Sequence, residues 1–219
     1  MRLQQYLNEQ RAAKELDVSL NEMVDLIQEE CQPFLKDWKS KYVKHFLYSG
    51  RNYGFEFGEG KVRKNRKPKD TPQEIHQMVD DWFKKKFGVR VRSNSMFLSF
   101  NRSVAINYGN TTYIIFPIGK YKLFSSSSVE DLYIDIKEML SKILRDHDAF
   151  MGGYALHLMY DDIKNIGSED EFEEKLYKFL EESFYTTNEY NKNEQALVCD
   201  KYYMIDTKYQ KELYSMLLR

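Results

Sequence analysis

The sequence predicts an α+β protein in which helices surround small, mostly antiparallel sheets. Short runs rich in β-branched and aromatic residues alternate with longer stretches whose apolar residues recur at helical spacing, and no internal repeat is found. With 219 residues, 42% of them hydrophobic, the chain has enough material for one sizeable core but hardly for two full catalytic domains. We therefore expect a helical segment over residues 1–40 and a single domain over 41–219.

The first elements are predicted from apolar spacing and turn residues. Apolar residues recur at helical spacing from about Glu15 to Cys31, and Pro33 interrupts that pattern. Residues 46–48 form a short apolar strand that leads into a turn. The segment 61–69 holds six basic residues and Pro68, so we expect a solvated loop there.

The clearest helix start lies at Thr71. Thr71 is suited to be an N-cap, Pro72 follows at the first helical position, and Glu74 completes a capping box. Gly88 is suited to end this helix. In residues 89–92 apolar and basic residues alternate, which predicts an edge strand.

The rest of the chain is divided by the same two periodicities. We expect a strand at 96–100, a helical turn at 103–108, a central strand at 112–118, a serine loop at 125–128, helices at 129–145 and from Ser168, strands at 196–198 and 202–205, and a last helix at 207–218. Asp200-Lys201 predicts a tight turn between the two late strands.

The charges cancel overall but are segregated along the chain. The formal net charge of −1 excludes a globally basic coat protein for nucleic acid and an acidic disordered chain. Residues 36–92 hold sixteen basic against seven acidic residues, whereas residues 160–182 hold three against nine.

Cys31 and Cys199 have no CxxC partner, which excludes a disulfide scaffold and favours a reducing compartment. No apolar run is long enough for a membrane span, so we expect a protein without membrane contact.

Common catalytic motifs are missing from the sequence. No P-loop, GxGxxG, GxSxG or HExxH pattern occurs. The four histidines form no HxxxH or HxH pair and have no nearby cysteines, so we predict no metal site. Chemistry must therefore come from dispersed residues.

Three separated segments occur in an informative order. They are Tyr48-Ser49-Gly50-Arg51 at the end of a strand, residues 96–100 followed by Ala105 and Tyr108-Gly109, and Glu194 just before a late strand. This layout resembles mono-ADP-ribosyltransferases of the arginine-serine-glutamate type, and residues 46–205 look like a branch of that superfamily carried by large tailed bacteriophages. The resemblance implies a split β-sandwich core, NAD as substrate, and transfer of ADP-ribose to a host protein or nucleic acid.

The resemblance also assigns roles to single residues. Cleavage of the bond between nicotinamide and ribose passes through an oxocarbenium-like transition state, which a carboxylate stabilises, and Glu194 takes that catalytic role. Ser99, preceded by Phe97, would brace the cofactor pocket by hydrogen bonding, with Ser95 as its competitor, and Tyr108 would stack on nicotinamide. Residue type alone favours an ordinary solvated glutamate at a strand end, and it is the match in order and spacing that raises Glu194 as a catalytic candidate.

The first motif departs from the family. An arginine is expected directly after Tyr48, where this chain has Ser49. Arg51 lies on the same strand face if the strand continues, and its guanidinium suits the diphosphate of NAD. Otherwise the role passes to Lys61, Arg63 or Arg92, or it is lost.

Two alternatives therefore stay open. One is a catalytically inactive internal protein of the virion that has kept the fold. The other is a nucleic-acid-binding module that uses residues 61–69 and 84–86 together with exposed aromatic rings.

The resemblance places the protein in the host cytoplasm and, with capsid association, in the virion. Residues Leu7-Asn8-Glu9 resemble a prohead protease signal, which would make 1–9 a processed leader.

Overall fold

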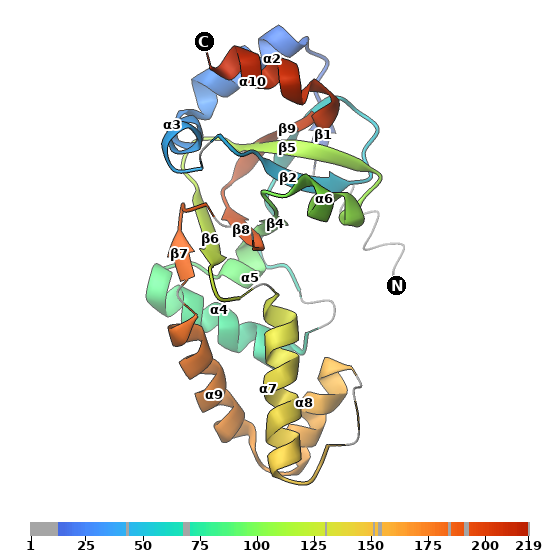
Figure 1. Ribbon diagram of the computed structural model, residues 1–219, viewed down its shortest axis with the longest axis vertical. Coiled ribbons are helices and arrows are strands. Elements are labelled where there is room, and N and C mark those ends of the chain that lie inside the picture. Colours follow the sequence, from blue (N-terminus) through green and yellow to red (C-terminus); the bar gives the residue numbers. More distant parts are fainter. Residues whose placement is uncertain are drawn as a thin grey trace. The chain divides into compact units, whose positions relative to one another are not determined.

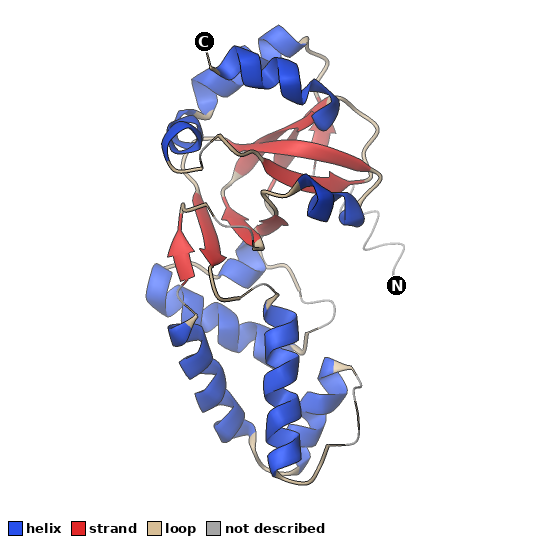
Figure 2. Cartoon of the chain, in the orientation of Figure 1, coloured by secondary structure: helices blue, strands red, loops and turns tan. Residues whose placement is uncertain are grey.

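The computed structural model describes residues 13–42, 44–67, 71–129, 131–150, 152, 155–183, 185–190 and 193–218. Within these residues the chain forms two antiparallel sheets and nine α-helices, which confirms the predicted α+β class (Figures 1 and 2). The proposed leader 1–9 lies outside them.

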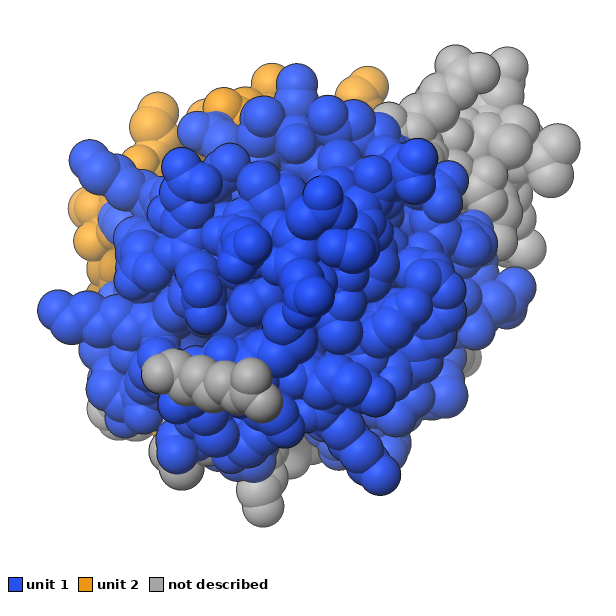
Figure 3. Space-filling model, turned by 90° about the horizontal axis from the view of Figure 1, so that it is seen from above, with its two compact units in different colours: residues 1–63, 95–125, 187–219 blue, residues 64–94, 126–186 orange. Residues whose placement is uncertain are grey.

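The chain divides into two compact units (Figure 3). Unit 1 comprises Met1–Arg63, Ser95–Ser125 and Thr187–Arg219, and unit 2 comprises Lys64–Asn94 and Ser126–Thr186. The boundary expected after residue 40 falls inside unit 1.

Five strands of unit 1 form the larger sheet. Its order is β1 (Ala13–Glu15), β3 (Phe57–Lys61), β9 (Lys201–Asp206), β5 (Thr111–Pro117) and β2 (Leu47–Arg51), with every neighbouring pair antiparallel. The expectation of a central strand near 112–118 is confirmed, because β5 lies between β9 and β2. Strand β1 was not expected, since three residues are too few to show an alternation.

Helices α2 (Leu20–Glu30), α3 (Gln32–Ser40) and α10 (Gln210–Leu217) belong to the same unit, and α2 lies beside α10 (Figure 1). A capping box between Ser19 and Glu22 starts α2. Pro33 lies in the first turn of α3, where its missing N–H breaks no helical bond, so a new helix begins at once. The ring of Phe34 packs edge-on against Phe116 of β5 at 5.6 Å between centroids, so α3 packs against the sheet.

The smaller sheet has the order β4 (Met96–Leu98), β8 (Gln195–Val198), β6 (Lys122–Ser126) and β7 (Tyr185–Thr187). The late strands β8 and β9 are consecutive in the chain but belong to different sheets. Residues 199–200 therefore connect two sheets and do not close the expected hairpin. Ser125 and Ser126 are buried in β6, so the serine run is not all loop.

Unit 2 is mainly helical, with α4 (Gln73–Phe87), α5 (Val91–Asn94), α7 (Leu132–Asp146), α8 (Leu156–Asn165) and α9 (Glu169–Glu182). The expected strand at 89–92 is wrong, because Val91 opens α5. The residue before α4 is Pro72, and no side chain caps this helix, so the box expected from Thr71 does not form. None of the described helices is both long and apolar enough to cross a membrane.

Residues 61–67 of the basic segment are described, and 62–67 form a loop without helix or strand, as expected. Lys61 is the last residue of β3, and the Val62 amide donates to the Asp200 carbonyl at 3.1 Å. In unit 2, the amides of Asn65 and Arg66 donate to the Asn94 side chain and the Ser93 carbonyl at 3.0 and 2.9 Å. Backbone amides thus hold Val62, Asn65 and Arg66, while Lys61, Lys64 and Lys67 are exposed.

Candidate functional site

Two of the three motif segments meet through their backbones. The Tyr48 amide donates to the Ser99 carbonyl at 2.7 Å, and the Ser99 amide donates to the Tyr48 carbonyl at 3.1 Å. This isolated antiparallel bridge joins β2, the outer strand of the larger sheet, to the residue that follows β4. The bridge thus places Ser99 at the edge of the larger sheet.

The third segment is brought in by strand register. Strands β4 and β8 are antiparallel, and Leu98 is paired with Gln195. Ser99 directly follows Leu98 and Glu194 directly precedes Gln195, so both residues lie next to the last pair of these two strands. Glu194 is solvent-exposed just before β8. Tyr48, Ser99 and Glu194 therefore belong to three segments of unit 1 that one backbone bridge and one strand pair join.

A short helical segment packs on the end of β2. It consists of α6 (Arg102–Ala105) and the 3₁₀ turn η1 (Ile106–Tyr108), which matches the helical turn expected at 103–108. A Cβ atom added at Gly50 would lie 2.1 Å from the Ala105 carbonyl oxygen. A Cβ added at Gly109 would lie 2.3 Å from the Arg51 amide nitrogen. Tyr108, the residue before Gly109, is consequently held near the end of β2 with its side chain 73% exposed.

The role proposed for Arg51 requires that its strand continue beyond Gly50, and this condition is met. Strand β2 continues through Arg51, which pairs with Thr111, so Ser49 and Arg51 share one face of the strand. Ser49 is buried and Arg51 is half-buried, with its Nε atom buried and without a hydrogen-bond partner. Burial raises the pKa of Tyr202 to about 12, and the positive charge of Arg51 opposes part of that rise. The guanidinium therefore lies within electrostatic reach of Tyr202.

The two serines proposed for the cofactor pocket differ in their surroundings. The Ser99 hydroxyl accepts a hydrogen bond from the Asn101 amide at 2.9 Å. Ser95 precedes β4, and its buried hydroxyl has no hydrogen-bond partner. Phe97 lies half-buried between them, opposite Ala196 in the β4–β8 pair. Only Ser99 of the two takes part in the bridge to Tyr48.

The other proposed sources of positive charge are dispersed. Lys61 and Arg63 belong to unit 1, where Lys61 is exposed and pairs with Lys201 across β3 and β9. Arg92 belongs to α5 of unit 2. Among the cations considered for the diphosphate, Arg51 alone lies on the strand that carries the first motif.

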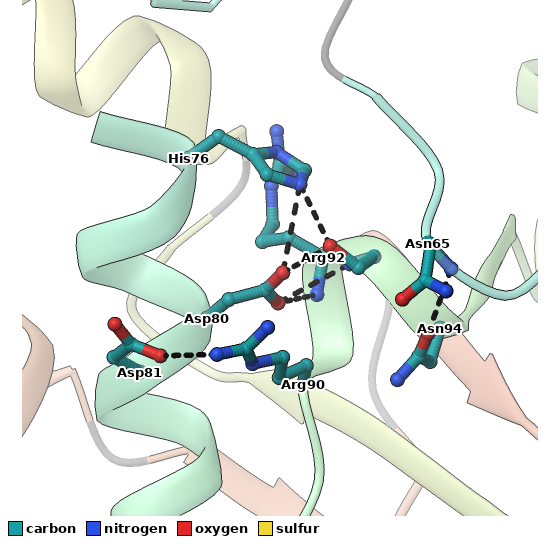
Figure 4. A network of polar contacts seen from close by, with 8 residues as sticks. Asn65, His76, Asp80, Asp81, Arg90, Arg92 and Asn94 are labelled. Carbon is teal, nitrogen blue, oxygen red and sulfur yellow. Dashed lines mark hydrogen bonds and ion pairs between the residues drawn. The ribbon is translucent and has the colours of Figure 1, made fainter. Parts of the chain in front are cut away.

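A second polar cluster lies inside unit 2 (Figure 4). The buried Asp80 carboxylate accepts hydrogen bonds from the amides of Arg92 and Ser93, at 2.7 and 3.2 Å, and from the Ser93 hydroxyl. The Nε2 atom of buried His76 lies 3.0 Å from the Ser93 hydroxyl and 3.5 Å from Asp80 Oδ2. Asp80 thus joins α4 to the start of α5.

This cluster contains the residue types of a serine hydrolase but not its geometry. A catalytic triad needs serine and aspartate on opposite nitrogens of the imidazole. Here both Ser93 and Asp80 approach the same atom, His76 Nε2, and the carboxylate already accepts two backbone bonds. The role of the cluster is therefore structural. Sequence reasoning missed it, although His76 and Asp80 stand four apart on one helix, where their side chains are neighbours.

Comparisons with protein-family models, with curated protein sequences and with solved structures found no match. Within the part of the chain that the structure describes, no group of three or more His, Cys, Asp or Glu side chains could hold a metal ion.

Proposed function

We propose that this chain binds NAD and transfers its ADP-ribose group to a macromolecular acceptor of a host cell. The observation that carries the proposal is the Tyr48–Ser99 bridge together with the β4–β8 pairing, whose last pair, Leu98 and Gln195, lies next to Ser99 and Glu194 in the chain. One bridge and one strand pair thereby join three segments that lie far apart in the sequence. The proposal extends to action in the host cytoplasm after delivery with the virion.

In the proposed reaction, the bond between ribose C1′ and nicotinamide breaks, and its electron pair leaves with nicotinamide. A nucleophilic atom of the acceptor forms the new bond to C1′ and gives up its proton. The Glu194 carboxylate stabilises the cationic ribose and takes that proton. Arg51 holds the diphosphate, and the unpartnered Nε of this half-buried side chain supports that role because a phosphate oxygen would satisfy it.

The proposal is tested by the release of nicotinamide from NAD and by transfer of label from NAD to proteins and nucleic acids of a host lysate. We expect Glu194→Gln to lower the turnover by about 10² to 10⁴-fold. Glu212→Gln is the matched control, since Glu212 is an exposed glutamate of α10 in the same unit. If the unaltered protein releases no nicotinamide and labels no acceptor, the enzymatic proposal is wrong.

One alternative is favoured by a specific observation. Ser49 occupies the position where the family has arginine, and its side chain is buried in β2. A chain that kept the fold as an inactive virion protein would tolerate that change. Calorimetry with NAD separates the two proposals, because the inactive protein would give neither heat of binding nor a shift in its melting temperature.

A further inference from the structure

The segment formed by α6 and η1 is attached to unit 1 in an unusual way. Of residues 102–108 only Ala105 is buried. The side chains of Val104, Ile106 and Tyr108 are exposed by 41%, 55% and 73%. A surface helix is ordinarily held by an apolar stripe that faces the core. This segment turns its large apolar side chains to solvent, so its position depends on backbone contacts.

Two glycines make those contacts. Besides its approach to Ala105, a Cβ at Gly50 would lie 2.9 Å from the Gly109 amide nitrogen. A Cβ at Gly109 would lie 2.6 Å from both the Cα and the carbonyl carbon of Arg51. Gly109 has φ 178° and ψ 166°, an extended conformation open to any residue. What excludes a side chain at Gly109 is therefore the lack of space.

We infer that Gly50 and Gly109 are positioning residues, which by their close backbone contact fix segment 102–108 on β2 so that Tyr108 and Arg51 act on one ligand. The identification of that ligand as NAD rests on the proposed function. The contact joins the two motifs directly, because Gly50 precedes Arg51 and Gly109 follows Tyr108. A side chain at either glycine would force the segment away from the strand.

A spin label tests the positioning without reference to catalysis. Ile106→Cys places a thiol on the exposed face of the segment, while Cys31 and Cys199 are buried and do not compete for the label. A nitroxide attached to this introduced thiol in the full chain reports the mobility of the segment by electron paramagnetic resonance. We expect Gly109→Ala and Gly50→Ala to increase that mobility. Gly54→Ala is the control, since no atom lies within 4 Å of a Cβ added there.

Catalysis supplies a second readout. With unlabelled protein, Gly109→Ala should raise the KM for NAD about tenfold or more, because a displacement of about 1 Å in a positioned group is sufficient for such a loss. The melting temperature should change little, since the segment contributes one buried side chain. Gly54→Ala should leave both the KM and the melting temperature unchanged.

A further variant covers the case in which an added Cβ prevents folding. Ala105→Gly removes the buried methyl group without any clash and leaves the backbone contacts in place, so the label should stay as immobile as in the parent. The inference is overturned if the label in Gly50→Ala and Gly109→Ala is as immobile as in the parent, or if Ala105→Gly alone mobilises it. The first result would mean that the Asn52 side chain, which accepts a hydrogen bond from the Asn110 amide at 2.8 Å, suffices as an anchor. If mobility rises but the unaltered protein neither binds nor cleaves NAD, the anchoring stands and the proposed function is wrong.

Discussion

The backbones of Tyr48 and Ser99 exchange two hydrogen bonds, and this pairing joins the edge of the larger sheet to the residue after β4. Because the bridge uses main-chain atoms, the side chain of Ser99 can be removed without breaking it. We expect Ser99→Ala to weaken NAD binding about tenfold, the equivalent of one hydrogen bond, measured by calorimetry. The midpoint of thermal unfolding should stay within a few degrees of that of the unaltered protein.

Ser95 provides the matched comparison for that experiment. Its hydroxyl is buried and has no hydrogen-bond partner, so Ser95→Ala removes an unsatisfied polar group. We expect this variant to be at least as stable as the parent and to bind NAD equally well. If Ser95→Ala loses NAD binding and Ser99→Ala retains it, the serine assignment must be exchanged.

Periodicity in the sequence predicted the longer elements but not those that tertiary contacts create. The apolar stripes over α4, α7 and α9 and the β-rich run of β5 are properties of contiguous residues, and each was expected close to its place. The alternation at 89–92 predicted a strand. Asp80, which belongs to α4, instead accepts hydrogen bonds from the amides of Arg92 and Ser93 and so stabilises the start of a helix there. Likewise, no local signal shows that β8 and β9 enter different sheets.

The same distinction applies to the candidate site. The order of its motifs is visible in the sequence, and the family resemblance of that order suggested roles. Their mutual approach depends on the Tyr48–Ser99 bridge and on the fit of Gly50 against Gly109, both of which are long-range backbone contacts. A pattern search does not register such contacts, so the sequence could name Arg51 but not establish that β2 reaches it.

Asp80 and Asp81 are neighbours on α4, and their replacement is expected to lower stability by very different amounts. Asp80 is buried and accepts hydrogen bonds from the start of α5, so Asp80→Ala should lower the free energy of unfolding by about 3 kcal/mol. Asp81 makes an ion pair with Arg90 at 3.1 Å between partly exposed side chains, and Asp81→Ala should cost about 0.5 kcal/mol at most. Urea denaturation of both variants measures the difference, and equal losses would contradict the capping role of Asp80.

Both thiols of the chain should be unreactive in the folded protein. Burial raises the pKa of Cys31 and of Cys199 to about 12, so neither forms the reactive thiolate at neutral pH. We expect a chromogenic disulfide reagent at pH 8 to modify neither thiol until a denaturant is added, after which both react. Rapid modification of the native protein would show that one of these cysteines is accessible.

His76 should make unit 2 less stable in mild acid. Burial lowers the pKa of His76 below its usual 6.5, the charges of Arg92 and Arg66 lower it further, and the Asp80 carboxylate opposes them. The folded protein thus keeps this imidazole neutral at a pH at which the unfolded chain binds a proton. Stability is full above pH 6.5 and is lost as the pH falls from there through the lowered pKa of the folded state.

The test compares the free energy of unfolding in urea at pH 7.5 with that at lower pH values. His76→Gln removes the titrating group, so the loss of stability below pH 6.5 should become smaller, although the variant is less stable at pH 7.5 because the contact with Ser93 is altered. His157→Gln is the control for the replacement of a histidine, since His157 is an exposed histidine of α8 in the same unit. An equal pH dependence in the parent and in His76→Gln would exclude His76 as its source.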